Sequence, residues 1–328
     1  MRSALRWWRW IGARIRPAQT AAPVVSVAPV LAAPVISVAP VLALAVLALL
    51  RPLFGAESAA PTAATKCPAP EAVDDRRIVQ RLEKEGADLI AAGRTTKMAA
   101  LIEQLKTKKC SLSIAAPGTE RIAQEAFYER LRPSVLIVSG IYKCEKCSKW
   151  HAAPAGGYPL TATGACVTNH HVLNNPKWET LIAMTADGRM LPVKAVLAAS
   201  SADDVAIVQL DGEGLTPVAL APDAPVGAHV RVIHHPDGRF YTLTEGVIAR
   251  YFATRRPGGN ATMMSITADY AKGSSGAPVF DDRGAVVGMV ADTVSIYYDE
   301  KAGHKDNLQM VIKECVPAAN VLKLIEKR

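Results

Sequence analysis

The chain has 328 residues, of which 50% are hydrophobic and 21% are charged, so it can bury one large hydrophobic core or two smaller ones. Its formal net charge is +8, but six of its arginines lie in the first 56 residues, where no acidic residue occurs. The rest of the chain carries 32 basic and 30 acidic side chains. With this near balance, nothing in the charge of the chain argues for binding to nucleic acid.

Residues 1–56 have the composition of a targeting segment. Arginines and tryptophans precede an uncharged tract in which an eleven-residue unit occurs twice, at 22–32 and 33–43, with two prolines in each copy. Because prolines interrupt a helix, the tract leaves a ten-residue apolar run at 41–50, which has the length of a signal-peptide core rather than of a membrane span. The sequence therefore favours export, with 57–73 as a linker. The alternative is an uncleaved anchor that associates with the membrane.

Residues 74–132 are predicted to form a helical region. Apolar residues recur at helical spacing over 78–90 and again over 98–105, which indicates two amphipathic helices. A third short helix is expected over 120–131, after the chain break that proline and glycine make at 117–118. The simplest interpretation is a collar that packs on the following domain, and a partner-binding role stays open.

From Ser134 onward the pattern changes to short runs rich in valine and isoleucine, separated by glycine and proline. Such runs are typical of antiparallel strands, and their number suggests β-barrels or a sandwich. The runs lie at 135–138, 165–167, 206–208, 230–233 and 285–290.

Three motifs in this β-rich part carry residues suited to acyl transfer. A serine hydroxyl is a weak nucleophile at neutral pH, so it needs a base, a carboxylate that orients the base, and donors for the oxyanion. The chain offers His171 as the base, Asp204 as the carboxylate and Ser275 as the nucleophile. The backbone amides of Gly273 and Ser275 are the predicted oxyanion donors. The order histidine, aspartate, serine is that of the chymotrypsin arrangement.

The same motifs resemble those of a known family. Thr-Asn-His-His-Val at 168–172, Asp-Val-Ala-Ile-Val at 204–208 and Gly-Ser-Ser-Gly-Ala-Pro at 273–278 are similar to segments of the trypsin-like serine peptidases of the HtrA type. Gly-Val-Ile at 246–248 and Ile-Thr-Ala-Asp at 266–269 match the stretch between them. The resemblance covers roughly residues 134 to 317.

The resemblance implies a mainly β fold with two antiparallel β-barrels of the chymotrypsin/trypsin type and an active site in the cleft between them. The peptidase domain is then expected over 133–317, with the crossing between barrels near 212–227 and a C-terminal helix over 318–328. Since 53 residues follow Ser275, we expect no PDZ domain after it.

The resemblance also decides between adjacent candidates. It selects His171 rather than His170, because the matching histidine directly precedes valine. It selects Asp204 rather than Asp203, because the matching aspartate directly precedes the apolar strand. The histidine pair at 234–235 is expected to lie in a loop and not to act as a second base.

Two interpretations of the substrate pocket stay open. Asp269 stands six residues before Ser275, where related enzymes that cleave after lysine or arginine keep an acid at the base of the pocket. The predicted strand 307–312 would form a pocket wall, and there Gln309 and Met310 would suit an aliphatic side chain instead.

Cysteines raise a separate question. An even number of cysteines in an exported protein favours disulfides, with fifteen pairings if all six join. Alternatively, Cys144, Cys147, His151 and Cys166 could form a structural zinc site, because two thiolates separated by two residues, with a nearby imidazole, suit that metal. The six are Cys67, Cys110, Cys144, Cys147, Cys166 and Cys315.

Two functions compete on this basis. The first is an exported serine endopeptidase that acts on proteins or peptides through an acyl-enzyme and requires no cofactor for its chemistry. The second is a noncatalytic protein-binding module on a protease scaffold, with the N-terminal helices and the cysteine cluster as its working surface. The presence of all three catalytic residue types favours the enzyme. The sequence makes no prediction of the oligomeric state.

Overall fold

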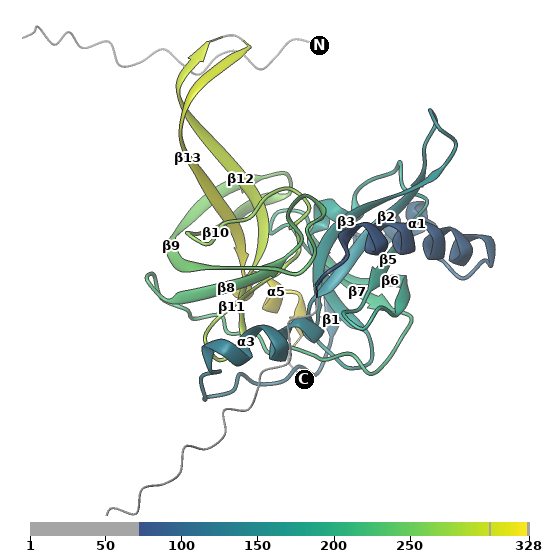
Figure 1. Ribbon diagram of the computed structural model, residues 1–328. Helices are drawn as coiled ribbons and strands as arrows, with labels where there is room; N and C mark the ends of the chain where they lie inside the picture. The colour runs from purple at the N-terminus through teal and green to yellow at the C-terminus, as the bar shows by residue number, and fades with distance from the viewer. Residues whose placement is uncertain (1–71, 302, 327–328) are drawn as a thin grey trace, which may run out of the picture. The chain divides into compact units, whose positions relative to one another are not determined.

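The computed structural model describes residues 72–301 and 303–326. The predicted targeting segment, almost all of the linker and Cys67 lie outside these residues. Within them, no helix has the length and apolar character needed to cross a membrane. The described part is mainly β, as predicted, and contains two closed six-stranded barrels (Figure 1).

The first barrel is antiparallel throughout, in the order β2-β3-β4-β7-β6-β5. Its strands bury long runs of valine, leucine and isoleucine, and β2 is buried over most of its length because one face lines the barrel and the other is covered by a helix. The strands are β2 Leu136–Lys143, β3 Trp150–Pro159, β4 Ala165–Thr168, β5 Thr180–Met184, β6 Met190–Ser200 and β7 Val205–Leu210.

The second barrel follows the connection 211–228, close to the predicted crossing, and has the order β10-β13-β12-β11-β8-β9. All of the runs predicted as strands contribute to one barrel or the other, which confirms the predicted fold class. The strands are β8 His229–His234, β9 Thr242–Arg256, β10 Gly259–Ile266, β11 Pro278–Phe280, β12 Val286–Lys301 and β13 His304–Pro317.

The helices of the N-terminal helical region pack on both barrels. Helix α1 (Asp75–Ala91) begins where the Asp74 side chain accepts a hydrogen bond from the Arg77 amide, and it packs against β2 and β3. Helix α2 (Met98–Gln104) packs against β6. Helix α3 (Gln124–Leu131) reaches the second barrel, where Phe127 meets Phe280 edge to face with ring centroids 6.0 Å apart.

The C-terminal segment differs from the prediction. Helix α5 (Ala318–Leu322) is shorter than the expected 318–328, because the chain turns into strand β14 (Ile325–Glu326). This strand pairs in parallel with β1 (Cys110–Ser111), which lies in the region predicted to be helical. Two-residue strands carry no periodic pattern, so only their pairing reveals them.

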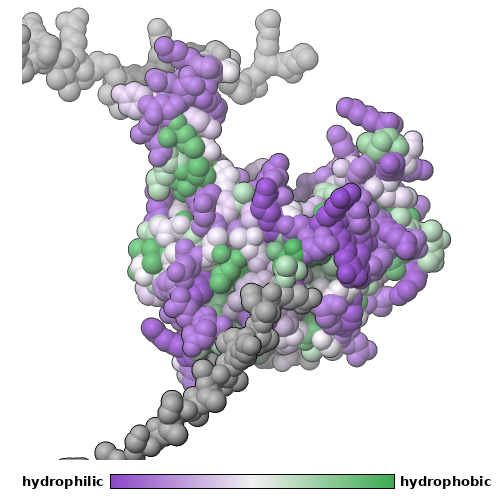
Figure 2. All heavy atoms as spheres, viewed as in Figure 1, coloured by the Kyte–Doolittle hydropathy of each residue, from purple (hydrophilic) through white to green (hydrophobic). Residues whose placement is uncertain are grey.

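Strands β12 and β13 extend beyond the second barrel as a long hairpin, which Figure 1 shows projecting from the barrel. The prediction covered only the first part of β12 and a short central part of β13. Figure 2 shows apolar surface on this hairpin between more polar stretches. Its exposed apolar side chains are Val294, Ile296, Tyr298, Leu308 and Met310.

Candidate active site

Strand pairing in the first barrel places His171 beside Asp204. Strand β4 pairs with β7, with Thr168 opposite Ala206, so the short helix α4 (His170–Leu173) that follows β4 meets the turn that precedes β7. His171 Nδ1 lies 2.9 Å from Asp204 Oδ2, and the His171 amide donates to Asp204 Oδ1 at 3.0 Å. Because a carboxylate only accepts, Nδ1 carries the proton and Nε2 is left free to act as a base.

Asp204 has hydrogen-bond partners other than His171 that fix its position. Its φ of 56° places it in the left-handed region, and the Asn169 side-chain amide donates to its carbonyl oxygen at 3.1 Å. Its side chain is buried, and Arg256 Nη1 at the end of β9 donates to Oδ2 at 3.3 Å. Arg256 belongs to the second barrel, and no local motif in the sequence pointed to it.

The adjacent residues that the sequence analysis rejected have other partners. Asp203 accepts a hydrogen bond from Ser200 Oγ at 2.8 Å and forms an ion pair with Lys323 at 3.2 Å. His170 is half-buried, and burial lowers its pKa. It lines the same cleft as His171.

Ser275 lies on a loop that the first barrel also holds. The Gly156 amide of β3 donates to the Ser275 carbonyl at 2.6 Å. Gly276 has a φ of 87°, and a Cβ on it would lie 2.1 Å from the Gly156 carbonyl oxygen, so a residue with a side chain does not fit there. Ser275 Oγ donates to the Ala291 carbonyl at 3.4 Å. Across the described residues, no hydrogen bond joins Ser275 to His171, a looseness that is common in sites without substrate.

The predicted oxyanion donors are arranged at a sharp turn of this loop. Gly273 has a φ of 89°, and a Cβ there would meet the His235 carbonyl at 2.8 Å. Among the residues described, neither the Gly273 amide nor the Ser275 amide has a hydrogen-bond partner. Two unpaired amides close together on a loop can bind a developing negative charge.

These groups share an open cleft of about 820 Å³ between the barrels. His171 and Asp204 enter it from the first barrel, whereas Ser275, Arg256 and Glu314 enter it from the second. Glu314 is partly buried beside Asp292, and burial raises its pKa. The cleft therefore combines a histidine, a serine and charged groups of both signs.

The structure corrects the predicted substrate pocket. None of Asp269, Gln309 and Met310 lines the cleft. The Asp269 side chain is 82% exposed and pairs with Lys313 at 2.7 Å, which lowers its pKa. Gln309 and Met310 lie on the projecting hairpin, where the Met310 residue is 59% exposed. The sequence placed Gln309 and Met310 in the pocket because it does not show at which residue β13 leaves the barrel.

Tyr270, the chain neighbour of Asp269, lines the cleft that Asp269 does not reach. Its ring is buried and lines the cleft, and its hydroxyl lies 2.9 Å from the Asp292 carbonyl and 2.6 Å from the Glu314 carbonyl. It therefore joins β12 to β13 beside Ser275. Its position next to Asp269 in a matched segment was the available signal.

The pair His234 and His235 is buried. His234 ends β8 and so does not lie in the predicted loop, whereas His235 lies in the connection after that strand. Burial lowers the pKa of each to about 4, so both are neutral at neutral pH. His234 Nδ1 contacts Ser274 Oγ at 2.9 Å, and His235 Nδ1 accepts from the Tyr241 amide at 3.2 Å. These contacts tie the histidines to the core rather than to the cleft.

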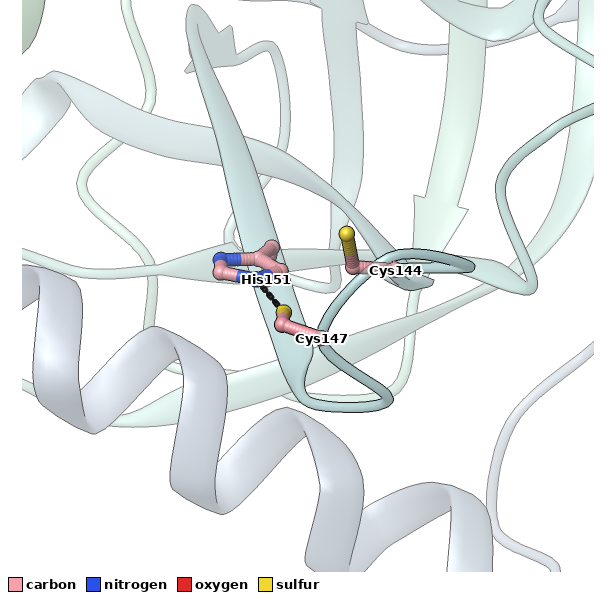
Figure 3. Close-up of side chains that lie close together, drawn as sticks. All are labelled: Cys144, Cys147 and His151. Atoms are coloured by element: carbon pink, nitrogen blue, oxygen red, sulfur yellow. Dashed lines mark hydrogen bonds between the residues drawn. The ribbon is translucent and has the colours of Figure 1, made fainter.

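A second group of reactive side chains lies at the turn between β2 and β3. Figure 3 shows Cys144, Cys147 and His151 gathered there, with Cys147 Sγ 3.1 Å from His151 Nε2. The fourth predicted ligand, Cys166, is not among them, because it lies buried in the first barrel on β4. The structure thus corrects the predicted set of four zinc ligands, because only three of them lie together. The predicted disulfides are also not formed among the described cysteines, which are all free thiols.

The segment that carries the cleft residues is similar to known proteins. Residues 157–289, which include His171, Asp204 and Ser275, match the family model of the trypsin-like peptidase domain. A probable periplasmic serine endoprotease DegP-like from Ectopseudomonas mendocina is 30% identical over 137 residues, covering 40% of this chain and 28% of that protein. Another protein of the same description from Pseudomonas fluorescens is 25% identical over 191 residues, covering 57% of this chain and 38% of that protein.

A relative with a different description also matches. The anti-sigma-I factor RsgI9 of Acetivibrio thermocellus is 28% identical over 171 residues, covering 51% of this chain and 22% of that protein. The chain therefore spans well under half the length of each of these three relatives.

Proposed function

We propose that this chain, of which residues 157–289 match the trypsin-like peptidase domain, is a serine endopeptidase that cleaves proteins or peptides through His171, Asp204 and Ser275. The observation that carries the proposal is the cleft between the barrels, where His171, already bonded to Asp204, and Ser275 face the same space. The chemistry requires no cofactor. The relatives named as periplasmic support export of this chain, with residues 1–56 as the targeting segment.

The proposed reaction follows from the positions of the donors and acceptors. Ser275 Oγ leaves the Ala291 carbonyl, transfers its proton to His171 Nε2 and attacks the scissile carbonyl carbon. The carbonyl oxygen becomes negative and binds the amides of Gly273 and Ser275. The protonated His171 then gives its proton to the leaving amine. Water, deprotonated by His171, hydrolyses the acyl-enzyme and regenerates Ser275.

Asp204 has two tasks in this scheme. Its hydrogen bond to Nδ1 keeps the proton off Nε2, and its negative charge stabilises the imidazolium that forms when Ser275 reacts. The bond between the His171 amide and Oδ1 fixes the carboxylate relative to the backbone that carries the base. Asp204 therefore acts through His171 and needs no contact with the substrate.

A fluorophosphonate probe tests the proposal directly, because it labels only a serine that a base has activated. The wild-type chain is expected to be labelled stoichiometrically and Ser275→Ala to remain unlabelled. Ser274→Ala is the matched control, since its hydroxyl contacts His234 and not the cleft. A wild-type chain that stays unlabelled would instead support the alternative function, a noncatalytic binding module on a protease scaffold. That alternative draws on the hydrogen bond from Ser275 Oγ to the Ala291 carbonyl, because it occupies the proton that His171 would have to accept.

Tyr270 makes a testable contribution to substrate preference. Tyr270 lines the cleft together with Ser275, and its hydroxyl bonds β12 and β13, so we infer that its ring limits the depth of the cleft beside the nucleophile. We expect the wild type to prefer small aliphatic side chains before the cleaved bond. Tyr270→Ala is expected to shift the kcat/KM ratio of a phenylalanine substrate to a valine substrate by about tenfold or more toward phenylalanine.

The ratio of two substrates is the measurement of choice, because partial unfolding of the variant lowers both rates equally. Tyr270→Phe is the control, since it keeps the ring and removes only the hydroxyl contacts. An unchanged ratio in Tyr270→Ala would show that this ring does not border the bound side chain.

A further inference from the structure

The turn between β2 and β3 brings two cysteines together by its backbone geometry. The Cys144 amide donates to the Lys149 carbonyl at 2.8 Å, and the Ser148 amide donates to the Cys144 carbonyl at 2.8 Å. Ser148 has a φ of 56°, which closes the turn in the left-handed region. Within this closed turn the Cys147 side chain is exposed and the Cys144 side chain is half-buried, and both sulfurs lie close to one imidazole (Figure 3).

His151 supplies that imidazole from the start of β3. It faces Tyr142 across the β2–β3 pair, and its Nε2 points toward Cys147 Sγ. The sulfurs of Cys144 and Cys147 and a ring nitrogen of His151 all lie within 4.8 Å of one another. Around a tetrahedral zinc ion, two such ligand atoms would be roughly 3.5 to 3.8 Å apart, given zinc bond lengths of about 2.0 to 2.3 Å. Small side-chain movements are enough to reach that arrangement.

Glu83 holds the other side of the ring. Its Oε1 on α1 lies 3.3 Å from His151 Nδ1. A carboxylate at one ring nitrogen fixes the orientation of the ring and leaves the other nitrogen for a metal, the arrangement usual for metal-binding histidines. The proposed reaction at Ser275 uses none of these four residues.

We propose that Cys144, Cys147 and His151 bind a zinc ion through two thiolates and Nε2. Glu83 positions the imidazole, and the fourth coordination position faces solvent at the exposed Cys147 and takes water or an external ligand. Thiolate and imidazole ligands select zinc over the hard cations magnesium and calcium. Zinc binding displaces the two thiol protons, so affinity rises with pH.

The zinc site links the β2–β3 turn through Glu83 to α1, the helix that packs on the first barrel. Further along β3, Gly156 donates to the Ser275 carbonyl, so one strand carries the zinc-bound turn at its start and contacts the loop of the nucleophile near its end. The ligands themselves do not line the cleft.

The test is a titration of the reduced, metal-free full chain with cobalt(II), which occupies zinc sites and gives thiolate-to-cobalt absorption. We expect one cobalt per chain, displacement by zinc, and a lower melting temperature when chelator removes the metal. Cys144→Ser, Cys147→Ser and His151→Ala are each expected to lose at least about 100-fold in cobalt affinity, because each removes a direct ligand. Cys110→Ser is the matched control, since this half-buried thiol lies outside the group.

Glu83→Gln separates the positioning role from a general effect on α1. It is expected to weaken cobalt binding by about 10-fold to 100-fold, whereas Glu85→Gln on the same helix, whose partner is Arg81, should leave binding unchanged. The proposal is overturned if the reduced wild type shows no thiolate-to-cobalt absorption, or if the absorption survives both Cys144→Ser and Cys147→Ser. A wild type that binds cobalt only through Cys110 would overturn it equally.

Discussion

Ser275→Ala and His171→Ala are each expected to reduce peptide turnover by about 10⁶-fold, the loss seen when one member of such a proton-transfer unit is removed. The physical reason is that Ser275 needs a base within reach, and in the proposed reaction that base is the imidazole of His171, which lines the cleft and is bonded to Asp204. The measurement is kcat on an unfolded protein or a peptide library, with folding checked by circular dichroism.

The double variant and a neighbouring histidine provide the controls. Since Ser275 and His171 act as one unit, the double variant should lose no more than either single variant. His170→Ala should keep turnover within about tenfold, because its imidazole lines the cleft without a bond to Asp204. Additive losses, or strong residual turnover in His171→Ala, would contradict the assignment of the base.

Asp204→Asn is expected to keep the fold and to lose roughly 10⁴ in kcat. The asparagine amide can donate to Nδ1, which would move the imidazole proton to Nε2 and leave no base facing Ser275. The variant also loses the charge that accepts from Arg256, so a modest decrease in stability should accompany the catalytic loss. Turnover and urea unfolding of the same preparations measure the two effects separately.

Asp203→Asn is the matched comparison, one residue away on the same turn. Its side chain contacts Ser200 and Lys323 and makes no contact with His171, so turnover should stay close to that of the wild type. If Asp203→Asn were the inactive variant, the turn before β7 would have to present the other carboxylate to the histidine.

The β fold could be predicted because its signals are local. Runs such as 206–208 and 230–233 are rich in branched side chains and bounded by turn residues, and both lie in barrel strands. The hairpin beyond the barrel gave a weaker signal, because much of β12 and β13 past Val290 and before Ile312 is exposed and carries charges. Its strands are held by mutual backbone pairing, and the apolar side chains that alternate along them, such as Val294, Ile296 and Tyr298, are exposed and mark no buried face.

The residues of the candidate site also fall into two groups, those that local motifs predicted and those that the sequence missed or misplaced. The segments around His171, Asp204 and Ser275 were recognised because each is a short motif whose residues are adjacent in the chain. Arg256 and Glu314 were missed because they reach the cleft from strands distant in sequence. Asp269 and Cys166 were misplaced for a related reason, since spacing along the chain does not show whether a side chain points to solvent, into the core or into a cleft.

The sequence by itself determined the type of fold and the order of the motifs, because short-range pattern and backbone preference decide these. The preference for His171 over His170 and for Asp204 over Asp203 came from the family resemblance. Only the tertiary structure decided what surrounds them. The β4–β7 register brought His171 to Asp204, and β3 held the loop of Ser275. The same folding brought Glu83 to His151, because two segments far apart in the chain meet only when α1 packs on the first barrel.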